Sequence, residues 1–331
     1  MIIRFPRPVT LKQEFHREEY CLLCYFQYSL TLTNLLTVPF HLYADDLQIY
    51  VSSPIETLSE AIERINRNLQ TIFLWSKSHG LNLNTSKSQY IIIGNQKQIA
   101  KFNITHLPAV IYDGTPISYS NSIKNLGIIM DNTLSWDSQI SHVSRKIFAT
   151  MGSLKKWKKF LPIKTKILLT TSLLLPIIDY ADICYLDLSQ EHLDKLERLQ
   201  NLCIRYIFGL KKFDHVSAFR DKLQWLTVRH RRYLHILCTL YSILFHPNTP
   251  RYLKERFTFL GTDSTLQLNL RSKSDNKLKI PICNTIGYKE SFTVKSVILW
   301  NDLPRYIRHS ESISIFKKSL KRYYLAQQKT V

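Results

Sequence analysis

Two adjacent carboxylates interrupt an apolar stretch at His41-Leu42-Tyr43-Ala44-Asp45-Asp46-Leu47-Gln48-Ile49-Tyr50-Val51. Apolar, aromatic and β-branched residues on both sides are typical of strands, and an Asp-Asp pair tolerates a tight turn. The stretch therefore predicts a β-hairpin with two acids at its tip. Neighbouring carboxylates repel each other unless a cation lies beside them, and Mg²⁺ is commonly held by one or two carboxylates together with substrate phosphates. Asp45 and Asp46 are thus candidate metal ligands. An aspartate that serves only the turn is the alternative.

Composition and charge indicate a globular protein with a polyanionic partner. The 331 residues are 45% hydrophobic and 12% aromatic, which is enough for two or three domains with a sizeable core. Lys and Arg number 45 against 25 Asp and Glu, a formal net charge of +20. This excess favours nucleic acid as the partner, ahead of an anionic membrane. No membrane span is expected, because the longest apolar run, 167–178, is interrupted by polar residues and is shorter than the roughly 20 residues that a bilayer requires.

The cysteines indicate a reducing compartment. Six are scattered along the chain, and the only CxxC pair, Cys21 and Cys24, has no second pair to complete a zinc site. The other four stand among apolar residues, so core packing is their expected role. The charged N-terminus does not resemble a secretory signal. We therefore expect an intracellular protein, nuclear or cytoplasmic, that is not secreted.

The region after the hairpin predicts one helix and several short strands. Apolar residues at positions 58, 62, 65, 69 and 72 follow helical spacing, and Gly80 is a stop signal. A turn at 84–88 containing Lys87 then leads into an expected strand at 90–94. Between 111 and 136, Asp113-Gly114 predicts a hairpin turn, and Gly127 divides an expected strand pair at 123–131.

From residue 137 onward the pattern becomes helical and basic. No Asp or Glu occurs between Asp137 and Asp179. A stretch of cations interleaved with aromatic residues can follow a phosphate backbone and stack a base, although a solvated helix face is the simpler explanation of a lysine run. The candidate nucleic-acid-binding residues are Arg145, Lys146, Lys155, Lys156, Trp157, Lys158, Lys159, Lys164 and Lys166.

The remainder of the chain predicts further helices. An apolar stripe from Leu193 ends at Gly209, and a second helix is expected over 223–244. The sequence Asp179-Tyr180-Ala181-Asp182 is interpreted as a helix-end turn rather than a second metal site, because no companion acids stand at useful spacing. A polar linker is expected over 248–290. Trp300 and Pro304 are expected to be structural, as an aromatic anchor and a turn before a last basic helix.

The order of these motifs resembles the reverse transcriptases of non-LTR retrotransposons (LINE, jockey-like). Tyr43-Ala44-Asp45-Asp46 is similar to the signature hairpin of that family. The Asn84-to-Ser88 turn, the Leu126-Gly127 pair, the basic helical block and the Trp300-to-Pro304 motif follow in the family's order. Each motif alone is weak, and their order makes the resemblance specific over about residues 38 to 325.

The resemblance implies an α+β fold. It would comprise an unassigned segment 1–37, an incomplete palm at 38–136 (an antiparallel sheet with a helix), a basic helical thumb at 137–247, the polar linker 248–290 and a C-terminal segment 291–331. In a complete enzyme, Asp45 and Asp46 would hold Mg²⁺ or Mn²⁺ and Lys87 would lie near the incoming dNTP. Leu126 and Gly127 would form the primer grip, and the basic block would hold the RNA template and DNA primer.

One requirement of two-metal nucleotidyl transfer is unmet in the sequence. The reaction needs a further carboxylate on a neighbouring strand. No Asp precedes Asp45, and Glu14, Glu18 and Glu19 stand in a charged, helix-like context. The expectation is therefore an RNA-directed DNA polymerase fragment that is inactive alone, with its fingers and upstream aspartate on a missing N-terminal half. A non-catalytic, basic nucleic-acid-binding remnant is the alternative, and a rarely translated chain without function is a third possibility.

Overall fold

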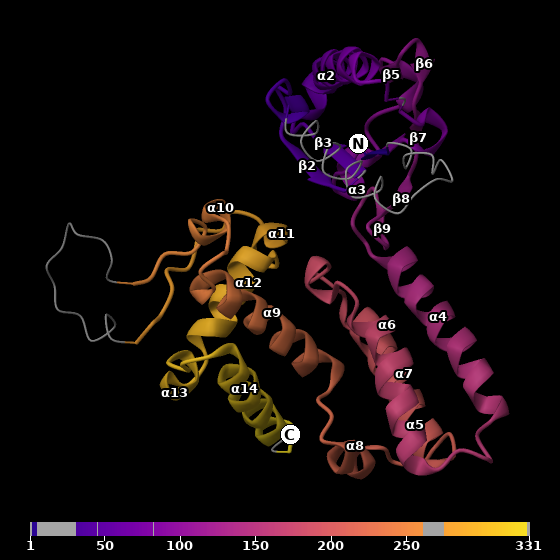
Figure 1. The fold of residues 1–331 in the computed structure, drawn as a ribbon, viewed down its shortest axis with the longest axis vertical. Coiled ribbons are helices and arrows are strands. Elements are labelled where there is room, and N and C mark those ends of the chain that lie inside the picture. Colours follow the sequence, from indigo (N-terminus) through magenta and orange to yellow (C-terminus); the bar gives the residue numbers. More distant parts are fainter. Residues whose placement is uncertain (1, 5–30, 45, 82, 261–274, 330–331) are drawn as a thin grey trace, which may run out of the picture. The chain divides into compact units, whose positions relative to one another are not determined.

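The computed structural model describes residues 2–4, 31–44, 46–81, 83–260 and 275–329. Within them the chain divides into two compact units, Met1–Ser138 and Gln139–Val331 (Figure 1). Asp45, the Cys21 and Cys24 pair, most of the segment 1–37 and the linker residues 261–274 lie outside the described residues. Mixed helices and small sheets agree with the expected α+β class.

The first unit is built on a five-stranded sheet in the order β2-β3-β1-β4-β7. Its strands are β1 (Ile2–Arg4), β2 (Phe40–Tyr43), β3 (Asp46–Ile49), β4 (Gln89–Tyr90) and β7 (Ser118–Tyr119). Neighbouring strands are antiparallel except β4 and β7, which run parallel. The expectation of a wholly antiparallel sheet is wrong at this pair, because a long connection rather than a tight hairpin joins the two strands.

Helix α2 (Leu58–Ser78) packs its apolar stripe against this sheet. Leu69 and Ile72 are completely buried, as are Leu47 and Ile49 of β3. Burying each such side chain stabilises the fold by about 1.5–3 kcal/mol. Gly80 adopts a φ of +66° just after the helix, a conformation that glycine reaches without steric cost. The predicted helix and its glycine stop are confirmed.

Two small hairpins complete the first unit, together with the short helix α3 (Gln96–Ile99). β5 (Ile111–Tyr112) pairs with β6 (Thr115–Pro116), and β8 (Ser122–Asn125) pairs with β9 (Ile128–Asp131). Both central residues of each turn have positive φ, 48° and 68° at Asp113-Gly114 and 44° and 88° at Leu126-Gly127. These values are typical of two-residue type I′ turns, so both predicted turns are confirmed. The strand expected at 90–94 is shorter than predicted, since only Gln89–Tyr90 pair.

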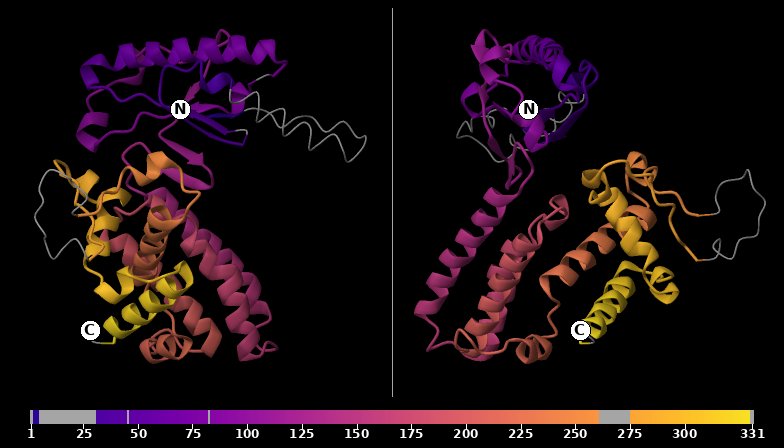
Figure 2. Two further views of the ribbon diagram at one scale, coloured as in Figure 1. Left: turned by 60° about the vertical axis from the view of Figure 1, so that its left-hand side comes forward. Right: turned by 180° about the vertical axis from the view of Figure 1, so that it is seen from behind.

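The second unit is helical. It begins with α4 (Asp137–Lys156), α5 (Ile163–Leu169), α6 (Leu175–Asp179) and α7 (Gln190–Phe208), followed by α8 (Ser217–Leu223) and α9 (Val228–Phe245). A π turn at Thr170–Leu174 joins α5 to α6, and α7 packs against both α5 and α9 (Figure 2). Gly209, with a φ of +72°, ends α7 as predicted.

The helix expected over 223–244 begins later than predicted. Gln224 has a φ of +53° and terminates α8, so the chain turns before the next helix starts. Thr227 then caps α9, its hydroxyl accepting a hydrogen bond from the His230 amide at 3.4 Å. The predicted range therefore joined the last residue of α8, Leu223, and the turn that follows it to α9.

The C-terminal helices form a second core around Trp300. They are α10 (Arg251–Lys254), α11 (Ile286–Lys289), α12 (Phe292–Asn301), α13 (Arg305–Arg308) and α14 (Ile313–Gln327). Trp300 is completely buried, and its indole nitrogen donates to the Asn276 carbonyl at 2.7 Å. Pro304 precedes the first residue of α13. The structural roles predicted for Trp300 and Pro304 are confirmed.

One helical stretch of the described chain, Ile163–Cys184, is long and apolar enough to cross a membrane by length and composition alone. This stretch is longer than the apolar run 167–178 that the sequence shows. Mostly buried core helices of soluble proteins meet the same criteria. This stretch contacts α7 within its own unit, but only 28% of its apolar window is buried. The four described cysteines are free thiols, and Cys203 is buried as predicted, whereas Cys238 and Cys283 are only partly buried. The prediction of core packing is wrong at Cys184, which is exposed.

Asp131 organises the turn between β9 and α4, and its removal should destabilise the protein. Its carboxylate accepts hydrogen bonds from the backbone amides of Thr133, Ser135 and Trp136 at 2.8–3.1 Å. Burial raises the pKa of Asp131, but the hydrogen bonds from Ser135, Thr133 and Trp136 outweigh it and leave the pKa below its usual value. We expect Asp131→Ala to lower the free energy of unfolding by about 1–3 kcal/mol at neutral pH.

The loss should depend on pH. A depressed carboxyl pKa stabilises the folded state above the unfolded value of about 3.9, and that contribution disappears as the pH falls through the folded pKa. In urea unfolding, the difference between Asp131→Ala and the unmodified chain should therefore shrink below about pH 4. Glu63→Ala, on the exposed face of α2, is the control and should change stability by less than about 0.5 kcal/mol. If Asp131→Ala lowered the free energy of unfolding as little as Glu63→Ala does, the proposed role of Asp131 in stabilising the turn would be contradicted.

Candidate functional site

The acidic hairpin forms where the sequence predicted it. β2 and β3 pair with Phe40 opposite Ile49 and Tyr43 opposite Asp46. Ala44 has a φ of +50° and begins the reversal of the chain. Asp46 is the half-buried first residue of β3, whereas its neighbour Asp45 lies outside the described residues. Of the predicted metal pair, the structure therefore describes Asp46.

The strand on the other side of β3 carries no acid at the matching position. β1 pairs with β3 so that position 4, an arginine in the sequence, stands opposite Asp46. Within the described ranges, the groups of acids and histidines close enough to share an ion are limited to Asp179, Asp182 and His235, far along the sequence from the hairpin. The described residues thus do not complete a two-metal carboxylate site at Asp46.

The Leu126-Gly127 turn is connected to the strand of Asp46. The side-chain amides of Gln48 and Asn125 form two mutual hydrogen bonds of 2.8 and 3.2 Å, which link β3 to β8. Leu126 and Gly127 follow Asn125 at the hairpin tip. Lys87 is exposed at the end of a 3₁₀ turn, Thr85–Lys87, which lies beside β1. The Asn84 side chain accepts a hydrogen bond from the Lys87 amide at 3.1 Å and fixes this turn.

The predicted basic block extends from the middle of α4 through the following turn into α5. Seven of its nine residues are exposed: Arg145, Lys146, Lys155, Lys156, Trp157, Lys159 and Lys164. Lys158 and Lys166 are half-buried. The block does not form one continuous face, because positions 145 and 146 lie some turns of helix before position 155.

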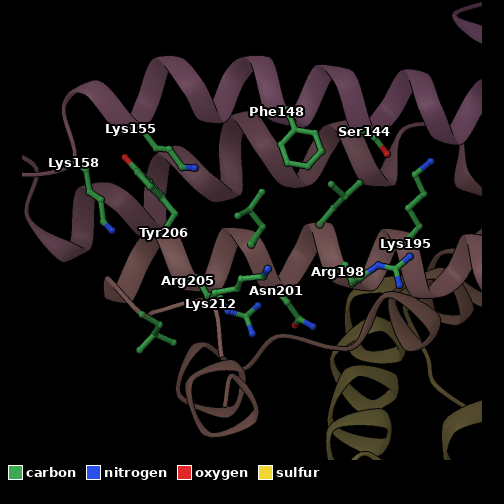
Figure 3. Close-up of a pocket in the computed structure, with 13 residues that line it drawn as sticks. Ser144, Phe148, Lys155, Lys158, Lys195, Arg198, Asn201, Arg205, Tyr206 and Lys212 are labelled. Carbon is green, nitrogen blue, oxygen red and sulfur yellow. The ribbon is translucent and has the colours of Figure 1, made fainter. Parts of the chain in front are cut away.

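A pocket of about 750 Å³ lies between α4 and α7 in the second unit (Figure 3). Lys155, Lys158 and Tyr206 gather at one end, whereas Lys195 and Arg198 lie at the other (Figure 3). Its full lining is Ser144, Phe148, Lys155, Lys158, Lys195, Arg198, Leu199, Asn201, Leu202, Arg205, Tyr206, Leu210 and Lys212. We call this pocket the basic groove.

All charged residues that line the basic groove are cations. Six of its lining residues are Lys or Arg and none is Asp or Glu. In the described part of the chain, no ion pair joins any of these six cations to a carboxylate. Arg205 is held by carbonyl groups, with Nε 3.2 Å from the Lys211 oxygen and Nη2 3.2 Å from the Asp214 oxygen. The groove therefore presents uncompensated positive charge, which attracts a polyanion.

The apolar part of the groove is also suited to a ligand with flat rings. Phe148 is 59% exposed and faces the groove from α4. Tyr206 is buried on the opposite side, and its hydroxyl donates to the Leu154 carbonyl at 3.3 Å. Burial raises the pKa of Tyr206, so this hydroxyl stays protonated and the bond between α7 and α4 persists at neutral pH.

Sequence reasoning missed the α7 side of the groove. Only Lys155 and Lys158 of the predicted basic residues line it, and the other four cations come from α7 and the loop that follows. The α7 segment was interpreted from its apolar stripe alone. Its cations at 195, 198 and 205 also recur on one face of a helix, a signal that the sequence contains.

The Asp179-to-Asp182 turn is an internal electrostatic cluster. Arg231 donates to both carboxylate oxygens of Asp179, and His235 Nδ1 lies 2.7 Å from an Asp182 oxygen. Candidate ligand atoms of Asp179, Asp182 and His235 lie within 4.8 Å of one another. Arg231 supplies at Asp179 the positive charge that a metal would otherwise bring. α6 ends at Asp179, so the predicted helix-end turn is confirmed.

Breaking the Asp179–Arg231 pair should cost stability. The two side chains are only 23% and 18% exposed, and removing one partner leaves the other charge partly desolvated. We expect Arg231→Ala to lower the free energy of unfolding by about 1–3 kcal/mol in urea. The matched control is Arg251→Ala, which removes an exposed pair with Glu255 and should change stability by less than about 0.5 kcal/mol. Equal effects of the two substitutions would contradict the structural role of Arg231.

Comparison with known proteins gives two related matches. No family model matches the chain. It is 22% identical over 250 residues to the RNA-directed DNA polymerase from mobile element jockey of Drosophila melanogaster, an alignment that covers 72% of this chain and 25% of the relative. It is 25% identical over 170 residues to the protein of the same name from Drosophila funebris, with 50% and 18% covered. The chain thus spans at most about a quarter of these relatives, and the similarity supports a reverse-transcriptase-like origin.

Proposed function

We propose that the chain is a piece of an RNA-directed DNA polymerase of a jockey-like non-LTR retrotransposon, and that on its own it binds nucleic acid without polymerising it. The observation that carries the proposal is the basic groove, with six cations and no carboxylate along its walls. The similarity to the jockey polymerases makes RNA and DNA the expected polyanions. An intracellular location, nuclear or cytoplasmic, is part of the same proposal.

In this proposal residues 137–247 act as the thumb of the polymerase. Neutralising phosphates with Lys and Arg releases condensed counterions, which supplies most of the affinity for nucleic acid. The groove cations come from α4, α7 and the segments that follow these two helices, so they can contact successive phosphates of an RNA–DNA hybrid. Phe148 adds an apolar surface for sugars or bases.

The hairpin would contribute to catalysis only with help from another segment. Asp45 and Asp46 would be the Mg²⁺ ligands, Lys87 would lie near the dNTP, and Leu126 and Gly127 would position the primer. Position 4, opposite Asp46 in the sheet, is an arginine, and among the described residues no group of three or more metal-ligating side chains includes Asp46. Because the donor set does not fit a two-metal site, we derive no catalytic step for this chain alone.

The groove should govern binding to an RNA–DNA hybrid. The triple variant Lys158→Ala/Lys195→Ala/Arg198→Ala should weaken binding at least tenfold at low salt. It should also reduce the slope of log K against log salt by about 2–3, roughly one per lost phosphate contact. Fluorescence anisotropy over a salt series measures both quantities.

The matched control is Lys317→Ala/Lys318→Ala/Lys321→Ala on the exposed face of α14, which removes the same charge. It should change the affinity by less than about threefold, since only the long-range field is altered. Equal losses for the two triple variants would mean that net charge, rather than the groove, determines binding.

Primer extension separates binding from catalysis. With an RNA template, a DNA primer and Mg²⁺ or Mn²⁺, the purified chain should bind the hybrid but not extend it. Asp45→Asn/Asp46→Asn should bind equally well, because neither carboxylate belongs to the groove. Extension by the unmodified chain that this double variant abolishes would overturn the proposal that the chain is inactive alone.

A further inference from the structure

Three aromatic side chains stand in solvent at the end of the basic groove. Trp157 and Phe160, in the turn after α4, are 63% and 79% exposed. Phe213, in the loop after α7, is 87% exposed. Large rings in water forgo the stabilisation that burial would give them, and a group of them beside charged residues is typical of a surface that contacts a partner.

Lysines accompany each of these rings. Trp157 and Phe160 are interleaved with Lys155, Lys156, Lys158 and Lys159. The ammonium of Lys212 lies 5.3 Å from the centre of the Phe213 ring. Lys155, Lys158 and Lys212 also line the basic groove. Tyr206, near the end of α7, donates to the carbonyl of Leu154, near the end of α4, so the two aromatic segments follow neighbouring helix ends.

Hydrogen bonds fix both segments. The Trp157 and Phe160 amides donate to the Leu154 and Trp157 carbonyls at 3.2 and 3.0 Å. In the other segment, Arg205 donates to the Lys211 and Asp214 carbonyls, and the Lys211 amide donates to the Asp214 carboxylate at 2.7 Å. The loop that carries Phe213 is thus held in place while its ring remains exposed. Preorganised rings lose little conformational entropy when a ligand binds.

We propose that these two segments form a single-strand platform, defined by Trp157, Phe160 and Phe213 with Lys155, Lys158 and Lys212. Unpaired bases of RNA or DNA stack on the rings of this platform, and the lysines bind the phosphates of the same strand where it enters the groove. Stacking requires a free base face, which a continuous duplex does not offer, so the platform prefers single strands. The inference rests on the proposed nucleic-acid-binding function and names the form of nucleic acid bound at this end of the groove.

An anionic membrane is the competing partner for a surface of aromatic rings and lysines. Charge and shape favour nucleic acid, because the rings flank a groove with cations on both walls rather than a flat face. Asp214, the acid nearest in sequence to Phe213, is not among the residues that line the groove, and its carboxylate accepts a hydrogen bond from the Lys211 backbone amide.

Trp157 is a built-in reporter for the test. The chain has five tryptophans, and the other four, Trp75, Trp136, Trp225 and Trp300, are at most 7% exposed. Titration of the full chain with a short oligothymidylate should quench the exposed tryptophan emission as a base stacks on the ring. A blunt duplex of equal length should bind through the groove with little quenching.

The variant Trp157→Leu/Phe160→Leu/Phe213→Leu keeps every charge and removes the rings. We expect it to weaken oligothymidylate binding by about tenfold or more, at least the equivalent of one lost stacking contact, while duplex binding changes by less than about threefold. Tyr252→Leu, at a 63% exposed ring on α10, is the control and should leave both affinities unchanged. Near-ultraviolet circular dichroism checks that each variant is folded.

The outcomes separate the two proposals. If the unmodified chain binds neither oligonucleotide, the proposed function fails together with the platform. If duplex binding persists and the ring variant binds oligothymidylate as well as the unmodified chain, only the platform is overturned. Loss of binding to phosphatidylserine vesicles in the ring variant, with oligothymidylate binding unchanged, would assign the rings to a membrane and overturn the platform as well.

Discussion

The buried carboxylate of Asp182 is the constraint on which the helical unit depends. A charged group that is 3% exposed loses its hydration, and several kcal/mol of desolvation must be offset by close partners. Nδ1 of His235 lies 2.7 Å from a carboxylate oxygen of Asp182. One helical turn earlier, the guanidinium of Arg231 donates to both carboxylate oxygens of Asp179. These two pairs tie the end of α6 to α9. A register shift of either helix would leave a buried charge without its partner.

The placement of other acids around α7 bears on the strongly basic character of the groove between α4 and α7. Two acids in and near α7 interact within the unit. Glu197 forms an ion pair with Arg220 and accepts a hydrogen bond from the Val228 amide, and Asp214 accepts a hydrogen bond from the Lys211 backbone amide. Among the described residues, the cations that line the groove from α7 therefore have no carboxylate in the lining and no ion pair with one. Since the chain carries a net charge of +20, the field of the groove adds to that of the whole molecule. Glu197 thus contributes to the packing around α7, while the absence of acids from the groove lining leaves the groove positive.

In the first unit, the neighbouring strands decide what an Asp-Asp hairpin can do. The hairpin forms from local pattern and turn chemistry, and the Gln48–Asn125 amide pair then joins it to the Leu126-Gly127 turn. A two-metal site would need another carboxylate facing Asp46, but the strand that pairs with β3 presents an arginine at that position. Whether such a hairpin can take part in a two-metal site therefore depends on the residues of the strands that pair with it. The distinction lies outside the hairpin itself.

The sequence by itself determined the elements whose signals are local. The spacing of Leu58, Ile62 and Leu69 specified α2, and two pairs of turn residues specified the short hairpins, because side-chain periodicity and positive φ are properties of neighbouring residues. The absence of acids between 137 and 179 likewise indicated one wall of the groove. Only the tertiary structure decided which face of α7 meets α4, which acids are buried against α9, and which residue stands opposite Asp46. These features join residues tens of positions apart, and their energies depend on desolvation and distance, which no local pattern records.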